Sequence, residues 1–365
     1  MLHGSRPVRR VGIVLLTGIG DVVHGLPLAN DIKRRTPGTE VVWVAEPAPA
    51  EVLRHHPAVD HVVVFDKSAG ARGVVQLLRE LSALRCDISI NCMRYAKSIW
   101  PVLGLRAPVR LGLARDKTRD GVHWLATHTL PEGPWEHTQD IFLRFREALG
   151  VPADDPVEWQ VSFSDQEEAA AEHWRRDLLA ATPQPEGSRP LIGLVLASAN
   201  AAKDWPAEAY AALVDPLVER FGALPVLIGG PSPREREVAD RVMSQARHRV
   251  VDALGPSVRE MMWRVREVDL LISPDTGPLH LAHALGTPVV GLFGHTNPAR
   301  VGPWRDSRDL VVDRYFDAGE AWQAALYTPR HGRMEQISVD DVLEAAGRAL
   351  DAEGRAHEAK GPASS

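Results

Sequence analysis

Four turns in this chain carry the residue types and spacings that could do chemistry. The first turn reads Thr17-Gly18-Ile19-Gly20-Asp21 and follows an apolar run. Two glycines after a strand allow a tight turn and a close approach of the backbone to a ligand. Asp21 stands where a helical pattern begins, so it could be an N-cap carboxylate. It could equally be a general base, with His24 three residues further on the same helix face.

The second and third turns hold one lysine and two glutamates. Lys203 is the only lysine between Lys117 and Lys360, and it lies just ahead of a helical pattern. A lysine there can bind a phosphate as a point charge, and a solvated loop charge is the alternative. Glu235 and Glu237 follow the glycine pair of the third turn. Such a carboxylate could accept hydrogen bonds from a ribose diol, or it could simply suit the first turn of a helix.

The fourth turn holds the densest set of polar groups, Asp275-Thr276-Gly277, between an apolar run and a helical pattern. Backbone N–H groups, a hydroxyl and a small residue at a helix start suit a diphosphate. A carboxylate suits phosphate poorly, so we assign Asp275 to capping or to sugar hydroxyls. Gly294 and Thr296 follow the next apolar run. We expect them to close the same pocket.

Metal and disulfide chemistry are disfavoured by the spacing of histidines and cysteines. His280 and His283 share a helical stretch, but no third ligand stands at a fitting spacing. We therefore expect no obligatory metal and no other cofactor. Cys86 and Cys92 form neither a disulfide framework nor a metal motif. They indicate a reducing compartment, hence a cytoplasmic protein.

Short apolar runs alternate with helical patterns in both halves of the chain, which is typical of βαβ units and parallel sheets. The runs predict strands over Val11–Leu16, Val41–Val44, His61–Phe65, Asp87–Asn91 and Val109–Leu113, and again over Leu191–Leu196, Pro225–Ile228, Val250–Val251, Leu270–Ser273 and Val289–Phe293. We therefore expect an α/β protein with two doubly wound domains in tandem. Ligands of such sheets bind beyond the carboxyl ends of the strands, which are the places of the four turns.

The domain plan follows from where this alternation stops and restarts. A proline- and charge-rich stretch lies near the middle of the chain, with an amphipathic helix inside it. The expected parts are a first domain at 1–160, a connector at 161–188, a second domain at 189–335, a last helix at 336–350 and a flexible tail at 351–365.

The composition excludes several classes of protein. The chain has 365 residues, 44% hydrophobic and 25% charged, which is ordinary for a globular protein. A net charge of −6 argues against a general nucleic-acid binder. No apolar run reaches membrane-span length, and the start is expected to be a buried strand rather than a signal peptide. Arg6, Arg9 and Arg10 could contact an anionic membrane surface.

Taken in order, the four turns resemble the heptosyltransferases of lipopolysaccharide core synthesis, glycosyltransferase family 9. The matching segments are residues 20–27 (Gly-Asp-Val-Val-His-Gly-Leu-Pro), 203–206 (Lys-Asp-Trp-Pro), 229–235, 275–280 (Asp-Thr-Gly-Pro-Leu-His) and 286–298. The resemblance implies a GT-B fold, with two Rossmann-like domains facing across a cleft and a last helix that crosses back toward the first domain. It also implies inverting transfer of heptose from ADP-heptose to Kdo or to the first heptose, at the cytoplasmic face of the inner membrane.

The resemblance also implies roles for individual residues. By position, Asp21 is the catalytic base. The implied donor residues, in the second domain, are Lys203 for phosphate, Glu235 for ribose, and Asp275, Thr276, Gly277, His280, Gly294 and Thr296 around the diphosphate and sugar. The implied acceptor residues, for a Kdo-lipid A-type partner, are Thr17, Gly20, His24, Lys97 and Arg119. One departure concerns the acceptor, because Asn91 stands where the family often has an acidic residue.

Three other functions remain open at this point. The enzyme could use another nucleotide sugar or another glycan acceptor. It could be a nucleotide-sugar epimerase of the same fold, which acts on the donor without an acceptor. It could be a non-catalytic protein that binds a nucleotide sugar. A dehydrogenase is disfavoured because both glycine turns lack the dinucleotide-binding spacing.

Overall fold

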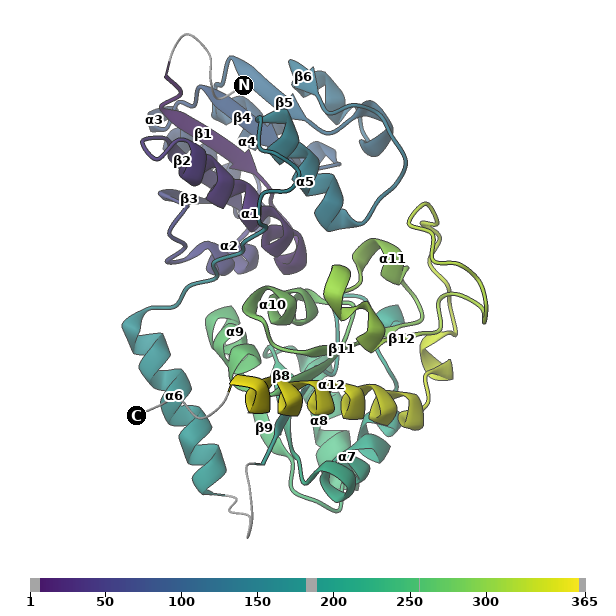
Figure 1. Ribbon diagram of the computed structural model, residues 1–365. Coiled ribbons are helices and arrows are strands. Elements are labelled where there is room, and N and C mark those ends of the chain that lie inside the picture. The colour runs from purple at the N-terminus through teal and green to yellow at the C-terminus, as the bar shows by residue number, and fades with distance from the viewer. Residues whose placement is uncertain (1–6, 182–188, 256, 361–365) are drawn as a thin grey trace. The chain divides into compact units, whose positions relative to one another are not determined.

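The structure, a computed structural model, describes residues 7–181, 189–255 and 257–360 (Figure 1). The chain divides into two compact units, residues 1–162 and residues 163–365, and we describe each by itself. Among the described residues, no helix has both the length and the apolar character that a bilayer span requires.

The first unit is built on a six-stranded parallel sheet with the strand order β3-β2-β1-β4-β5-β6. The strands are β1 (Arg10–Val14), β2 (Glu40–Ala45), β3 (His61–Val64), β4 (Ile88–Asn91), β5 (Val109–Gly112) and β6 (His128–Thr129). In the register, Val11 of β1 pairs with Val41 of β2 and with Ile88 of β4. The central strands are apolar on both faces, as strands covered by helices on both sides must be.

Helices cover this sheet and bury its apolar side chains. They are α1 (Ile19–Arg35), α2 (Pro47–Leu53), α3 (Ala71–Ala83), α4 (Ile99–Gly104) and α5 (Thr138–Ala148), with 3₁₀ turns η1 (Lys67–Ala69), η2 (Ala96–Ser98), η3 (Arg115–Lys117) and η4 (Val122–Leu125). The largest fully buried side chains of the unit are Trp43 and Phe145. Cys86 and Cys92 are both buried and free.

The second unit repeats the plan with the strand order β12-β11-β10-β7-β8-β9. The strands are β7 (Leu191–Leu194), β8 (Leu224–Gly229), β9 (Val251–Leu254), β10 (Leu270–Pro274), β11 (Val289–Phe293) and β12 (Val311–Asp313). All neighbouring pairs in the sheet are parallel. Two parallel six-stranded sheets of Rossmann type confirm the predicted fold class.

The helices of the second unit include α6 and α12, which the sequence analysis assigned to the connector and to a separate last helix rather than to the second domain. They are α6 (Asp165–Ala180), α7 (Ala207–Phe221), α8 (Pro233–Gln245), α9 (Val258–Glu267), α10 (Gly277–Leu285), α11 (Pro298–Val301) and α12 (Val339–Lys360), with 3₁₀ turns η5 (Ala201–Lys203), η6 (Arg305–Leu310) and η7 (Met334–Gln336). α6 lies in the expected connector and packs against α9.

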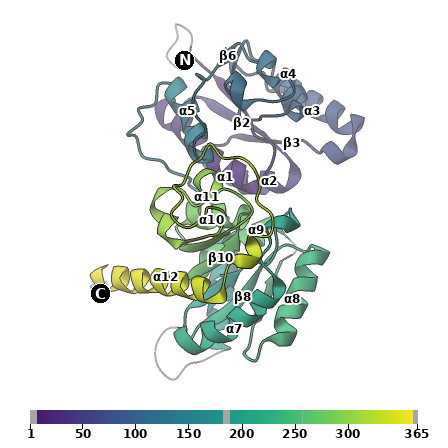
Figure 2. The same ribbon diagram turned by 90° about the vertical axis from the view of Figure 1, so that its right-hand side faces the viewer.

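The last helix belongs to the core of the second unit. α12 packs against α7, and Figure 2 shows it in yellow beside that unit. Its buried residues Val342, Leu343 and Ala346 join the core cluster. The helix continues to Lys360, ten residues past the expected end at 350, into the segment expected to be a tail. The rest of that segment, 361–365, lies outside the described residues, and the crossing back toward the first domain stays a prediction.

The same crossover occurs in both sheets and decides where the sites lie. In each unit the chain builds three strands outward in one direction, then returns to place its fourth strand beside the first. β4 therefore lies beside β1, and β10 lies beside β7. The carboxyl ends of these neighbouring strands form the crevice in which doubly wound sheets bind ligands.

Candidate functional site

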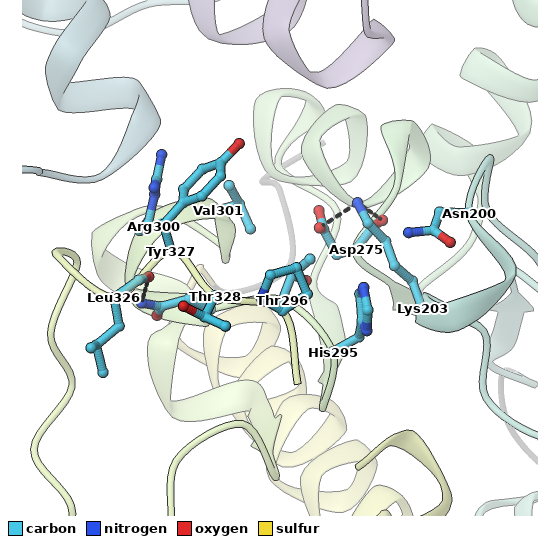
Figure 3. Close-up of a pocket in the computed structure, with 12 residues that line it drawn as sticks. Asn200, Lys203, Asp275, His295, Thr296, Arg300, Val301, Leu326, Tyr327 and Thr328 are labelled. Carbon is cyan, nitrogen blue, oxygen red and sulfur yellow. Dashed lines mark hydrogen bonds and ion pairs between the residues drawn. The ribbon is translucent and has the colours of Figure 1, made fainter. Parts of the chain in front are cut away.

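The centre of the second unit's site is an ion pair between Lys203 and Asp275. Lys203 follows β7 and Asp275 follows β10, so the crossover of the sheet brings them together. Lys203 Nζ lies 2.7 Å from Asp275 Oδ2 and 3.3 Å from the carbonyl oxygen of Asp275. Figure 3 shows the two side chains pointing toward one another. An ammonium has three N–H donors, so Lys203 can hold Asp275 and a ligand oxygen at once.

Asp275 is a buried carboxylate kept charged by two partners. His280 Nε2 lies 3.6 Å from Asp275 Oδ1, on the side away from Lys203. Burial alone would raise the pKa of Asp275, but His280 and Lys203 outweigh it and hold the pKa well below its usual range. The N-cap of α10 is Thr276, so the expected capping role of Asp275 is wrong. Its carboxylate instead orients the lysine.

The N-terminus of α10 lies next to this pair. Thr276 is the N-cap, Gly277 is the first helical residue and Pro278 follows it. No side-chain cap is formed there, Pro278 has no N–H, and the N–H of Leu279 donates to the carbonyl oxygen of Thr276 at 3.1 Å. The backbone donors that this helix start can offer a ligand are therefore those of Thr276 and Gly277. A helix N-terminus with an adjacent ammonium favours an anion such as a diphosphate.

A cavity of about 310 Å³ opens beside Lys203 and Asp275. Its volume is at the lower end of the range for small-molecule sites. Its lining comes from the turn after β7, the turn after β11 and a later loop: Asn200, Lys203, Asp275, His295, Thr296, Asn297, Arg300, Val301, Leu326, Tyr327, Thr328 and Pro329. Thr296 therefore lies in the wall, as the sequence predicts.

The loop after β12 forms one side of this cavity, and sequence reasoning missed it. Asn297 Nδ2 donates to the carbonyl oxygens of Gln323 and Leu326, both at 2.8 Å. The Arg300 guanidinium lies 4.2 Å from the centre of the Tyr327 ring. The only signal in the sequence was Asn297 itself, one residue before the end of the segment 286–298. The loop residues carry no pattern of their own.

Gly294 has a packing reason for being glycine. A Cβ on Gly294 would lie 2.5 Å from the backbone carbon of Arg333, which no side chain can tolerate. Close packing of the turn after β11 against the backbone at Arg333 therefore requires glycine here. Gly294 itself is not among the cavity-lining residues, so its place among the donor residues stays a prediction.

Glu235 lies outside the cavity lining and is bonded within its own turn. Its Oε1 accepts from Gly230 N at 3.0 Å, and its Oε2 accepts from Ser232 Oγ at 2.7 Å. A Cβ on Gly229 would lie 2.4 Å from Glu235 Oε1, which is the end of a flexible side chain, so a larger residue at 229 would displace this carboxylate. The ribose role of Glu235 stays a prediction. The neighbouring Arg234, which the sequence reasoning passed over, pairs with Asp204 at 3.1 Å and links this turn to the turn after β7.

The first unit gathers Asp21 and Lys97 at its own crossover. Asp21 lies in the first turn of α1 and is exposed. The N-cap of that helix is Gly18, whose φ of 46° suits glycine, so Asp21 is not the N-cap residue. Lys97, which follows β4, donates a hydrogen bond to Thr17 Oγ1. Burial, with the charge of Lys67, lowers the pKa of Lys97.

The other predicted acceptor residues differ in how far they are exposed to solvent. His24 is buried and its Nδ1 lies 2.9 Å from Gln139 Oε1, which is the setting of a packed histidine. Gly20 is buried in α1, whereas Arg119 is exposed. Asn91 is buried, and its amide bonds Ser98 Oγ and the backbone of Met93. An uncharged amide suits these two partners, so Asn91 is structural here.

Among the residues that the structure describes, no three His, Cys, Asp or Glu side chains gather as metal ligands. His280 pairs with Asp275. The expected absence of an obligatory metal stays a prediction.

A crevice with a lysine and a helix start at the strand ends of a Rossmann-like unit is the usual place for a nucleotide in this class of fold. The family model of glycosyltransferase family 9 (heptosyltransferase) matches residues 74–319. The chain therefore belongs to this family and is a glycosyltransferase. This confirms the resemblance drawn from the four turns, and it argues against the epimerase and the non-catalytic binding protein.

Curated relatives and solved structures agree with this assignment. The lipopolysaccharide core heptosyltransferase OpsX of Haemophilus influenzae is 27% identical over 83% of this chain and 84% of its own length. Lipopolysaccharide heptosyltransferase 1 of Pseudomonas aeruginosa is 27% identical over 82% of each chain. A family 9 glycosyltransferase from Veillonella parvula has the same fold, with a TM-score of 0.78 at 23% identity over 94% of this chain and 97% of its own. E. coli heptosyltransferase WaaC, solved with ADP, gives 0.69 at 20% identity over 93% and 99%.

Proposed function

We propose that this glycosyltransferase moves heptose from ADP-heptose to the inner core of lipopolysaccharide, with inversion at the transferred carbon. The acceptor is Kdo or the first heptose. The observation that carries the proposal is the Lys203–Asp275 pair beside the open N-terminus of α10. The related E. coli heptosyltransferase WaaC has been solved with ADP and with ADP-2-deoxy-2-fluoro heptose, which supports the same donor here.

The donor diphosphate binds between Lys203 and the first backbone N–H groups of α10. As the sugar leaves, negative charge builds up on the diphosphate. A preorganised ammonium and a helix N-terminus stabilise that charge more than they stabilise the bound donor. Asp275 is bonded to Lys203 at 2.7 Å, so the lysine does not need to reorganise during the reaction. This cationic set supplies the stabilisation that a divalent metal supplies in other transferases.

Asp21 serves as the general base in this proposal. A sugar hydroxyl has a pKa far above neutrality, so it needs a proton acceptor as it attacks the anomeric carbon. The Oδ atoms of Asp21 take that proton while the C–O bond to ADP breaks. A single displacement forms the new glycosidic bond on the opposite face of the sugar and leaves ADP as the second product.

The first unit binds the acceptor with its cationic and hydroxyl groups. Lys97 and Thr17 are bonded to each other at the crossover of the first sheet. Arg119 is exposed, so it can meet an anionic sugar acid. Glu46 and Lys67 form an ion pair at 2.6 Å, and both charges act on Lys97.

A nucleotide panel tests the donor assignment most directly. Thermal unfolding is followed with ADP, UDP, GDP and adenosine at equal concentrations. We expect ADP to stabilise the protein by about 2–3 kcal/mol at a hundredfold excess over its dissociation constant, and UDP and GDP to do much less. Adenosine, which lacks the diphosphate, is the control and should fall well below ADP. Equal stabilisation by ADP and UDP would contradict an adenine-nucleotide donor.

A further inference from the structure

The first unit exposes a group of large apolar side chains close together in the chain, which we call the aromatic face: Tyr95, Trp100, Leu103 and Trp124. Trp124 is 82% exposed, Leu103 is 49% exposed and Trp100 is 47% exposed. Most large apolar residues of the unit are buried, so this cluster is a departure from its surroundings. Exposed apolar groups that gather in one place mark an interaction surface.

The fold presents these side chains from neighbouring elements. Trp100 and Leu103 are three residues apart on α4, so they share one side of that helix. The 3₁₀ turn η4, which carries Trp124, packs against α4. Gly121 lies just before η4 with a φ of 71°, and a Cβ there would lie 3.0 Å from the Trp124 ring. The left-handed glycine therefore makes room for the ring; α4 and its neighbour α3 are seen in Figure 2.

The stretch of chain that carries the aromatic face is positive, although the whole chain carries −6. Residues 88–131 contain seven Lys and Arg but only two Asp and Glu. Both acids are engaged, because Asp116 pairs with Lys117 and Asp120 accepts a hydrogen bond from Ala96 N at 3.3 Å. Three arginines of this stretch are exposed: Arg106, Arg115 and Arg119.

We propose that the aromatic face docks the protein on an anionic phospholipid bilayer. Tryptophan and tyrosine partition to the level of the lipid headgroups, and arginines beside them are attracted by the negative surface potential. A second copy of this chain fits the surface less well. A symmetric dimer would set the same arginines against each other, and like charges in an interface are unfavourable.

The aromatic face suits this role better than the arginines at the start of the chain. The Arg10 guanidinium is bonded to Glu40, which neutralises its charge. Arg9 is exposed but has no exposed aromatic side chain next to it in sequence. Arg6 lies outside the described residues. The aromatic face combines three exposed aromatic rings with exposed arginines in one stretch of the chain, which neither Arg9 nor Arg10 does.

Vesicle flotation tests the proposal with the full chain. The vesicles are phosphatidylcholine alone and phosphatidylcholine mixed with phosphatidylglycerol. The wild-type protein should float with the anionic vesicles only. Trp124→Ser and Arg106→Glu should each weaken that partitioning by about tenfold. The first variant removes an aromatic ring from the lipid interface, and the second reverses a positive charge. The controls Val64→Ser and Arg9→Glu, on the far edge strand and at the start of the chain, should bind as the wild type does.

Two further measurements keep the result interpretable. The thermal transition of the first unit should be the same in all four variants as in the wild type, which shows that this unit folds. ADP-induced stabilisation should also be unchanged, which separates this proposal from the donor assignment. Lipids with brominated chains should quench the wild-type tryptophan fluorescence more than that of Trp124→Phe. The proposal is overturned if the wild type does not float with anionic vesicles, or if only Arg9→Glu loses binding. A dimer that Trp124→Ser dissociates, without vesicle binding, would assign the surface to a second copy instead.

Discussion

At the scale of single residues, the proposed donor site depends on the hydrogen bond by which Asp275 holds Lys203. The carboxylate is buried, and His280 and Lys203 keep it ionised. Its charge therefore fixes the ammonium at the mouth of the cavity instead of leaving a long flexible side chain to find the ligand. A preorganised lysine loses less conformational freedom on binding a phosphate than a solvated one.

Replacing this lysine should separate phosphate recognition from base recognition. Lys203→Ala removes one charge-assisted hydrogen bond, so ADP affinity should fall by about tenfold to a hundredfold. Adenosine affinity should change little. Isothermal titration with both ligands measures the difference.

A matched control for this variant is Lys33→Ala, because Lys33 is a surface lysine that pairs with Asp60 in the first unit. It should bind ADP as the wild type does. An equal loss of ADP and adenosine affinity in Lys203→Ala would argue that the lysine shapes the cavity rather than contacts phosphate.

At the scale of elements, the predicted donor-binding residues lie beyond the carboxyl ends of the parallel strands. The sequence predicted Lys203, Asp275 and Thr296 near one another, because apolar runs end just before each of them and parallel strands align their carboxyl ends. The loop at 323–330 was not predicted. It has no periodic pattern, and it is held by the Asn297 amide and by backbone atoms, which leave no signature in residue types.

Glu167 of α6 links that helix to α9. Its carboxylate accepts two hydrogen bonds from Arg259, at 2.7 and 2.6 Å, and closes a capping box with Ser164. The hydrogen bond from Arg259 is the main reason that the pKa of Glu167 is lowered to about 2. The helix that the sequence placed in a connector is thereby tied to the second unit.

The pKa of Glu167 predicts a pH dependence of stability. A carboxyl with a lowered pKa stabilises the folded state above its unfolded pKa, and this is lost as the pH falls through the folded value. Glu167→Gln should therefore cost about 1–2 kcal/mol at neutral pH, and clearly less at about pH 3, where the unfolded chain is mostly protonated at this carboxyl. Urea unfolding between pH 7 and about pH 3 measures the difference. The more exposed Glu168, changed to Gln, is the control, and a pH-independent cost for Glu167→Gln would refute the assignment.

At the scale of the whole molecule, the chain consists of two units of the same strand order. Each unit has its own sheet and its own buried core. The tandem α/β plan could be predicted because its strands are short and apolar and are separated by helical patterns. The length of α12 could not, because its last turns carry a helical but mostly polar sequence that also suits a frayed tail.

Separate cores predict that the units can be destabilised separately. In the first unit, Arg146 forms a buried ion pair with Asp31, and their side chains are 3% and 1% exposed. Arg146→Ala leaves that carboxylate with fewer partners, so the first unit should lose about 3–5 kcal/mol of stability. Calorimetry should show an earlier transition for that unit, while ADP still raises the transition of the second unit. The account of independent cores is wrong if ADP binding is lost in parallel.

The central claim is that Asp21 deprotonates the acceptor while the second unit holds the donor. The most direct measurement is turnover of wild type and Asp21→Asn with ADP-heptose and a Kdo-lipid A-type acceptor, followed by ADP release and product mass. Asp154→Asn, an exposed aspartate of the first unit, is the control. Turnover should fall by about a hundredfold or more in Asp21→Asn, with ADP affinity unchanged. Near-normal turnover in Asp21→Asn would contradict the claim.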